Sequence, residues 1–293
     1  MKNFIFTNNR LYISFLAFLF FSLNCINITK SDTDIKKTEF IIAGAKVIFG
    51  YPIEGNLIIA KTDPSYKIML DSADIFIDQD GLFVFGFHRD AETNSELKIK
   101  TEDGFEFITV LRPIQRKYFI ERIDGLKRSM VTPSQDDQER IENDIESVRF
   151  ARNIKTPTGD FWKGFDWPVV GRISGSFGSQ RILNGIPKTP HYGVDIAAPQ
   201  GTLIMSPASG IVTLAKDLYY SGNTVILNHG LSVNSTFLHL DKIFVKVGDE
   251  VERGKKIGLL GQTGRSTGPH LDWRIDWKGR RLDPEMLAGS MNK

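Results

Sequence analysis

The sequence predicts a mainly β protein, with an N-terminal immunoglobulin-like β-sandwich, one connecting helix and a C-terminal antiparallel β domain. Short runs of β-branched and aromatic residues recur along most of the chain, and clusters of Gly, Pro, Asn and Asp separate them. One stretch near the middle has instead the apolar spacing of an amphipathic helix. The 293 residues exceed what one compact domain usually takes, so we expect two domains and a leader.

The first 25 residues are predicted to form a signal peptide or a lipoprotein leader. Lys2 and Arg10 supply positive charge, and residues 11–23 form a largely apolar run. The run is too short for a comfortable membrane span, which indicates a secretory leader rather than a permanent anchor. The leader predicts export to the bacterial cell envelope, with the periplasm as the expected compartment and membrane attachment left open.

A single cysteine directly follows the leader. Cys25 stands where a lipoprotein carries its acylated cysteine, but Asn24 before it is larger than the residue that a lipobox prefers. The sequence therefore leaves lipidation open. With no second cysteine, the chain cannot form an internal disulfide. Residues 26–37 are polar and unperiodic, which predicts a tether.

Residues 38–125 are predicted to form the β-sandwich. Short β-type runs alternate here with turn signals, a pattern typical of the immunoglobulin-like build. This part has no cluster of His, Cys or carboxylates that suggests catalysis, so we expect a spacer or a module that docks an envelope protein. The expected strands lie in residues 40–49, 57–61, 66–70, 73–77, 82–87, 97–100 and 105–111.

A connecting helix is predicted in residues 130–155. Thr132-Pro-Ser-Gln135 forms a capping box with proline at the first helical position. Ile141, Ile145 and Val148 then recur on one face at helical spacing. The helix could connect the two domains, or it could cover a cleft of the domain that follows, and the sequence leaves both open.

Four of the five histidines lie within residues 191–273. A glycine with aromatic and β-branched neighbours favours a strand or strand entry from His191 to Asp195. In a strand, residues i and i+4 share a face, and so do His270 and Asp272 at i and i+2. Imidazole and carboxylate ligands around one ion, with a position left for water, are typical of a catalytic zinc site.

A further histidine, His239, lies in an alternating run that predicts a strand. On this pattern Phe237 and His239 share one face, and Leu238 and Leu240 lie on the other. We expect His239 to stand near the ion without being a ligand. His229 ends a neighbouring strand-like run and is predicted to take no part in the site.

Together these motifs resemble the lysostaphin/LytM-type zinc endopeptidases, the murein hydrolase family that cuts peptide cross-links in bacterial peptidoglycan. The family signature is His-x-x-x-Asp, then aromatic-x-His-Leu, then His-x-His, and the resemblance covers roughly residues 165–285. It implies a zinc metallopeptidase domain in residues 160–290. Further strings that look like the family lie in residues 171–178, 191–199, 225–230 and 247–251.

The match departs from the family at one metal ligand, because Asp272 stands where the signature has its last histidine. The resemblance then implies one Zn²⁺ per chain, held by His191, Asp195 and Asp272. Two carboxylate ligands would also suit Mn²⁺. The resemblance implies two catalytic residues, His270 as general base and His239 as stabiliser of the tetrahedral oxyanion.

Substrate contacts are implied by the loop in residues 180–190, because the equivalent loop borders the substrate groove in the family. Arg181 and Asn184 are the candidate residues. Arg181 could pair with a carboxylate of a stem peptide.

The predicted function is an exported, metal-dependent endopeptidase that acts on peptidoglycan stem peptides or cross-links, so peptidoglycan is the expected partner. One alternative is an inactive regulator that activates wall amidases by binding alone, since Asp272 marks where loss of ligands could begin. Another is a barrel adaptor, because residues 245–254 look like hairpins of biotinyl and lipoyl carrier domains. The net charge of +2 gives no indication of nucleic-acid binding.

Overall fold

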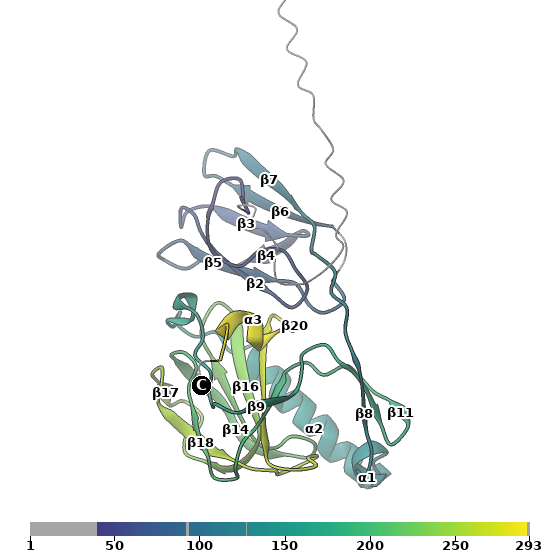
Figure 1. Ribbon diagram of the computed structural model, residues 1–293. Coiled ribbons are helices and arrows are strands. Elements are labelled where there is room, and N and C mark those ends of the chain that lie inside the picture. The colour runs from purple at the N-terminus through teal and green to yellow at the C-terminus, as the bar shows by residue number, and fades with distance from the viewer. Residues whose placement is uncertain (1–39, 92–93, 127, 292–293) are drawn as a thin grey trace, which may run out of the picture. The chain divides into compact units, whose positions relative to one another are not determined.

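The computed structural model describes residues 40–91, 94–126 and 128–291, and its elements confirm the predicted mainly β class (Figure 1). The predicted leader, Cys25 and the predicted tether lie outside the described residues. Within the described ranges, every helix is too short or too polar to cross a membrane.

Two antiparallel sheets account for the strands before residue 112, with the orders β1-β2-β5 and β4-β3-β6-β7. Buried side chains from both sheets, among them Leu57, Phe85 and Leu97, belong to one hydrophobic core. The immunoglobulin-like topology and the domain boundaries stay predictions. The strands are β1 (Lys46–Phe49), β2 (Leu57–Lys61), β3 (Lys67–Leu70), β4 (Ala73–Ile75), β5 (Leu82–Gly86), β6 (Ser95–Lys100) and β7 (Glu106–Leu111).

A small sheet joins the segments before and after the long helix. Strand β8 (Ile120–Ile123) runs parallel to β10 (Gln180–Leu183), and β10 also pairs with β11 (Ile186–Pro187). The register of β8 and β10 places Arg181 opposite Glu121. Arg181 therefore lies on a strand, and the prediction that it belongs to a loop is wrong.

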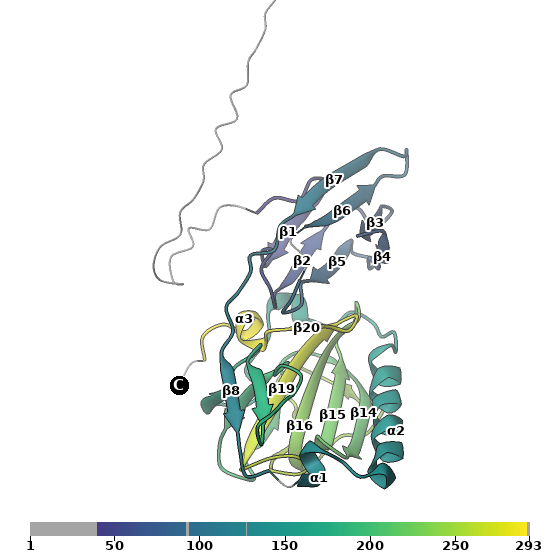
Figure 2. The same ribbon diagram turned by 90° about the vertical axis from the view of Figure 1, so that its right-hand side faces the viewer.

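A large antiparallel sheet carries His239 and His270, with the central strand order β17-β14-β15-β16-β19-β12-β9 (Figure 2). Strand β13 pairs with β18, β18 also pairs with β16, and β20 pairs with β19. Its strands are β9 (Arg172–Gly175), β12 (Val194–Ala197), β13 (Leu203–Met205), β14 (Gly210–Leu218), β15 (Gly222–Asn228), β16 (Val233–Ile243), β17 (Glu250–Val251), β18 (Lys256–Leu260), β19 (His270–Trp277) and β20 (Arg280–Leu282). The short helices are α1 (Arg128–Val131), η1 (Phe161–Lys163) and α3 (Pro284–Ala288).

The long helix α2 (Gln135–Arg152) begins later than the sequence predicts. Its N-cap is Ser134, whose hydroxyl accepts from the backbone N–H of Asp137 at 3.3 Å, and Thr132 lies before it. Ser134 Oγ also donates to the Asp137 carboxylate at 2.7 Å, so the capping pair is shifted by two residues.

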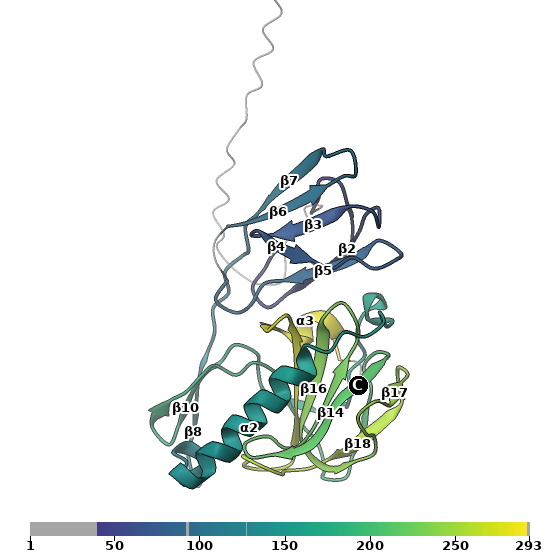
Figure 3. The same cartoon turned by 180° about the vertical axis from the view of Figure 1, so that it is seen from behind.

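The predicted apolar stripe of α2 is also partly wrong. Ile145 is 52% exposed, whereas Ala151 and Asp144 are buried. The reason is that α2 crosses strands β14 and β15 and packs Ala151 among their apolar side chains (Figure 3). Asp144 is tolerated there because it accepts from the backbone N–H of Tyr219 at 2.7 Å.

Candidate metal centre

The antiparallel register of β12 and β19 places Asp195 opposite Asp272. Directly opposed residues of antiparallel strands project to the same face, so the two carboxylates lie side by side. Leu271 and Trp273, which flank Asp272, are fully buried in the core on the other face. His191 belongs to the segment that enters β12 rather than to the strand itself, as a strand entry predicts.

Three donor atoms converge at this point. His191 Nε2 lies 3.0 Å from Asp195 Oδ1 and 3.5 Å from Asp272 Oδ2, and the three ligand atoms lie within 4.8 Å of one another. Tetrahedral ligands at roughly 2.1 Å from a zinc ion lie about 3.4 Å from each other. The two separations from His191 Nε2, 3.0 and 3.5 Å, lie on either side of this value.

Unpartnered polar atoms support the same interpretation. His191 Nδ1, His191 Nε2 and Asp195 Oδ1 are buried and make no hydrogen bond of acceptable geometry with any other described residue. Buried polar atoms are normally paired, and an ion is one group that satisfies them. The residues therefore fit a divalent cation.

Two glycines allow the carboxylates to come so close to the backbone. A Cβ on Gly193 would lie 2.5 Å from Asp272 Oδ1, and a Cβ on Gly175 would collide with the Asp195 carboxylate. Glycine has no Cβ, so the backbone at these two positions can lie directly against the carboxylates of Asp195 and Asp272.

The protonation states of the two carboxylates suit metal binding. Burial raises the pKa of Asp272, but the Arg274 guanidinium and His191 outweigh it and hold that pKa well below its usual value. For Asp195, burial is likewise outweighed, chiefly by His191, and the pKa is lowered. Both carboxylates are therefore ionised at neutral pH.

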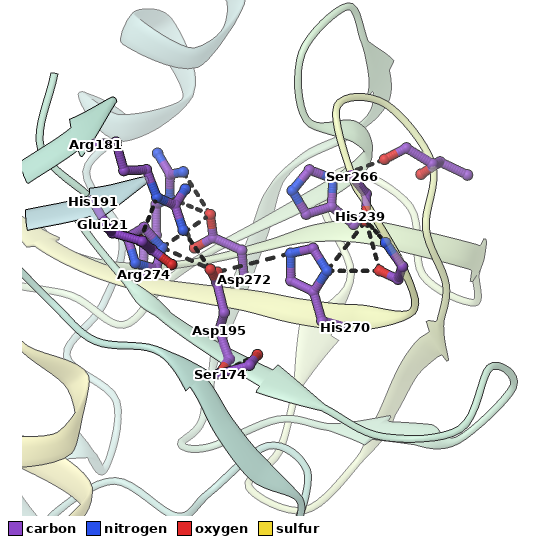
Figure 4. Close-up of polar contacts among 12 residues, drawn as sticks. Glu121, Ser174, Arg181, His191, Asp195, His239, Ser266, His270, Asp272 and Arg274 are labelled. Carbon is purple, nitrogen blue, oxygen red and sulfur yellow. Dashed lines mark hydrogen bonds and ion pairs between the residues drawn. The ribbon is translucent and has the colours of Figure 1, made fainter. Parts of the chain in front are cut away.

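Each carboxylate also carries an arginine partner (Figure 4). Arg274 Nη2 donates to Asp272 Oδ2 at 2.6 Å, and Arg274 Nε donates to Asp272 Oδ1 at 3.0 Å. Arg181 donates to Asp195 Oδ2 and, at 3.1 Å, to the Glu121 carboxylate. Sequence reasoning missed Arg274, although it follows Asp272 by two residues and so shares its face of the strand.

The second candidate substrate contact, Asn184, does not join this cluster. Its amide donates to the Leu126 carbonyl at 2.7 Å and accepts from the Leu126 N–H at 3.2 Å. The cause is the pairing of β10 with β8, which turns Asn184 toward the segment after β8. Arg181, in contrast, belongs to the cluster, because it pairs with Asp195.

Two histidine rings lie on the side of the carboxylates opposite the arginines (Figure 4). The rings of His239 and His270 are 4.8 Å apart, and His270 Nε2 lies 3.8 Å from Asp195 Oδ1. Nδ1 of His239 contacts the Thr263 carbonyl at 2.7 Å, and Nδ1 of His270 contacts the Gly268 carbonyl at 2.8 Å. Because a carbonyl oxygen can only accept a hydrogen bond, Nδ1 of each ring must carry a proton. In the neutral ring Nε2 is then unprotonated and can accept a proton.

The predicted alternation around His239 is wrong. Leu238 lies opposite Asp272 in the register of β16 and β19 and therefore faces the cluster. His239 has a φ of +66°, a left-handed conformation that returns its side chain to the same face. Phe237 and Leu240 are both fully buried in the core. This conformation is uncommon for a residue other than glycine and is typical of functional sites.

A cavity of about 850 Å³ opens at the cluster. Its walls come from α2, from β16 and β19, and from the segment after β18, and they include Asp272, His239 and Arg181. Helix α2 is tied to the sheet by Arg152, whose Nε lies 2.8 Å from the buried Asp276 Oδ1. The sequence left open whether the helix connects the two domains or covers a cleft, and in the structure α2 lines the cavity.

His229 is a buried structural residue in the described part of the chain. Its Nδ1 lies 2.8 Å from the Ser209 carbonyl, and its Nε2 lies 2.9 Å from Ser235 Oγ. Burial lowers the pKa of His229 to about 4. The ring is therefore neutral in the folded protein at neutral pH.

This lowered pKa predicts acid destabilisation. The unfolded chain takes up a proton at His229 near pH 6.5, whereas the folded chain resists until about pH 4, so stability is lost as the pH falls through this window. We expect protonation of His229 to lower the free energy of unfolding by about 3 kcal/mol between pH 7 and pH 4. Urea unfolding of wild type and His229→Gln over this range measures it. Equal pH dependence in the two proteins would contradict the assignment.

Fold and site together define a β-sheet metallopeptidase domain, and comparison with known proteins agrees. Residues 189–284 match the family model described as Peptidase family M23. These residues form an M23 peptidase domain, which confirms the resemblance to the lysostaphin/LytM family. A solved structure assigned to peptidase M23 from Pseudomonas aeruginosa aligns with a TM-score of 0.63 and 26% identity, covering 84% of this chain and 98% of that chain.

Curated relatives match over the same part of the chain. Peptidoglycan DD-endopeptidase ShyA of Vibrio cholerae is 43% identical over 114 residues, which are 38% of this chain and 26% of the relative. DD-carboxypeptidase/endopeptidase Mpg of Neisseria meningitidis is 37% identical over 122 residues, which are 41% of this chain and 28% of the relative. The matched region thus spans about a quarter of the length of these relatives.

Proposed function

We propose that this protein is an exported, metal-dependent endopeptidase that hydrolyses peptide bonds in peptidoglycan stem peptides or cross-links. The observation that carries the proposal is the convergence of His191 Nε2, Asp195 Oδ1 and Asp272 Oδ2 beside two anchored histidines. The matched relatives include peptidoglycan DD-endopeptidases, which supports the choice of substrate. The compartment is proposed to be the cell envelope.

His191, Asp195 and Asp272 would hold one divalent cation. We propose Zn²⁺, and the two carboxylates in the donor set would also suit Mn²⁺. When bound, such an ion acts as a Lewis acid toward a peptide carbonyl and makes water a usable nucleophile at neutral pH.

The two histidines would move the protons. We assign His270 as the general base, because its available Nε2 faces Asp195 at 3.8 Å. Burial lowers the pKa of His239 to about 4, so this ring is neutral at rest. A proton taken up from bulk solvent as negative charge develops beside the ring would let its Nε2 donate to the oxyanion, and that proton returns to solvent when the intermediate collapses. His239 is therefore assigned to the tetrahedral oxyanion, and His270 returns its proton to the leaving amine.

A cleavage assay tests the proposal. Purified protein with stoichiometric Zn²⁺ is expected to convert cross-linked muropeptides to shorter fragments, followed by liquid chromatography and mass spectrometry. Addition of a chelator should reduce the rate at least 100-fold, and added Zn²⁺ should restore it. Cleavage that persists in chelator, or no cleavage by a folded, zinc-loaded protein, would reject the proposal.

A second candidate function is that of a regulator that activates wall amidases by binding alone. One observation favours it: Arg274 and Arg181 already pair with Asp272 and Asp195, so the charges of both carboxylates are balanced by the chain's own residues. A folded protein that binds no stoichiometric zinc, cleaves nothing and stimulates an amidase would establish this alternative.

A further inference from the structure

The cavity beside the metal centre is strongly cationic. Eight of its lining residues are Lys or Arg, and two, Asp144 and Asp272, are acidic. The whole chain, in contrast, has 37 basic and 35 acidic residues. A cleft lined by one sign of charge concentrates ligands of the opposite sign.

Three arginines of this wall come together from different elements. Arg181 lies on β10, Arg274 lies on β19, and Arg265 lies between β18 and β19. The Arg265 guanidinium stacks over the Tyr220 ring at 4.5 Å, and its backbone N–H donates to the Tyr220 carbonyl at 2.7 Å. All three line the same cavity, and the charges of Arg181 and Arg274 add to burial in lowering the pKa of Arg265.

The paired arginines retain hydrogen-bonding capacity. Arg181 uses Nε and Nη2 for Glu121 and Asp195, and Arg274 uses Nε and Nη2 for Asp272. Among the described residues, no acceptor binds Nη1 of either side chain, and each Nη1 carries two N–H donors. Both side chains are mostly buried, with 18% and 25% exposed, so these donors have restricted access to water.

The charge of the cluster points to an anionic ligand. Three guanidiniums are balanced by Asp195, Asp272 and Glu121, and a divalent ion on His191 and the two aspartates would leave an excess of positive charge. Hydrogen bonds from a guanidinium to a carboxylate are charge-assisted, and Nη1 of Arg181 and Nη1 of Arg274 would each supply donors for one. The aromatic and aliphatic parts of the cavity, including Tyr219 and Ile145, suit the body of a peptide.

We propose that Arg181, Arg265 and Arg274 form a carboxylate-binding subsite beside the metal centre, so that the preferred substrate is a peptide with a free carboxylate close to the bond that is cut. This inference rests on the proposed endopeptidase function and specifies its substrate. Figure 4 places Arg181 and Arg274 on the side of the two aspartates opposite His239 and His270. Arg265 comes from the segment whose Thr263 and Ser266 contact those histidines, so the subsite borders the metal centre on both sides.

Binding measurements test the subsite separately from cleavage. The zinc-loaded His270→Ala variant serves as a host without turnover, and calorimetry gives its affinity for a cross-linked muropeptide dimer. The same dimer is then measured with each free carboxylate replaced in turn by a carboxamide. We expect one replacement to weaken binding at least tenfold. No measurable binding of the dimer, or less than a threefold effect of every replacement, would overturn the subsite.

Variants then locate the effect. Arg265→Gln in the same host should reduce the discrimination between carboxylate and carboxamide to less than threefold, and Arg265→Lys should give an intermediate value because it keeps the charge but not the planar fork. Arg112→Gln is the matched control, since Arg112 is exposed in the segment after β7 and does not line the cavity. Unchanged discrimination in a folded Arg265→Gln protein would exclude Arg265 from the subsite. If the host discriminates but wild type cleaves neither dimer, the endopeptidase proposal fails and the subsite stands.

Discussion

Asp272→Ala is expected to abolish stoichiometric zinc binding and peptide cleavage together. The substitution removes one of three ligand atoms, so zinc affinity should fall by more than the roughly 10- to 100-fold that loss of an outer partner costs. It also leaves Arg274, which binds Asp272 at 2.6 Å, without its carboxylate. Competition with a chromophoric zinc chelator measures the affinity, and the muropeptide assay measures the activity.

Loss of folding must be separated from loss of a ligand, because an uncompensated arginine can destabilise a protein by about 3–5 kcal/mol. Asp272→His is the matched control, since it also deprives Arg274 of its carboxylate but supplies an imidazole, the ligand that the family signature has at this position. We expect Asp272→His to retain zinc when Asp272→Ala does not. If both variants lose zinc while remaining folded, or if Asp272→Ala keeps it, the assignment of this ligand is wrong.

His270→Ala is expected to keep zinc and lose turnover. His270 lies outside the group of three ligand atoms, and its Nε2 is 3.8 Å from Asp195 Oδ1. Removal of a general base or acid typically lowers the rate by about 10²- to 10⁴-fold. The zinc competition and muropeptide assays measure the two properties on one protein preparation.

Comparison of His270→Ala with Asp272→Ala tests which of the two residues binds the metal and which transfers protons. His270→Ala should bind zinc as wild type does, with kcat reduced by at least 100-fold. If His270→Ala loses zinc as completely as Asp272→Ala, His270 is a ligand rather than a proton carrier. If it retains wild-type kcat, His270 has no catalytic role.

Two arginines hold the carboxylates of Asp195 and Asp272 in place by hydrogen bonds. Arg274 lies on the same strand and face as Asp272, and orients its carboxylate through both nitrogens of the fork. Arg181, from a different sheet, donates to Asp195 through Nη2 alone, and its Nε donates to Glu121. This places residues from the segments before and after α2 at the metal centre.

Much of this organisation is readable from local patterns. The mainly β class follows from alternating short runs and turn residues, and most predicted strands lie within a residue or two of those in the structure. The proximity of Asp195 and Asp272 follows from motifs whose residue types and spacing are specific. The helix start shifted from Thr132 to Ser134 because several hydroxyl residues compete for one cap.

The sequence by itself determined the class of fold and predicted the three metal ligands and the two catalytic histidines, because these depend on residue type and short-range spacing. Only the tertiary structure decided that Arg181 and Arg274 bind the two aspartates, that α2 lines the cavity, and that His239 turns toward the cluster. The physical reason is that these features depend on strand register, on the packing of distant segments and on one left-handed backbone conformation. None of the three is encoded in the periodicity of a single segment.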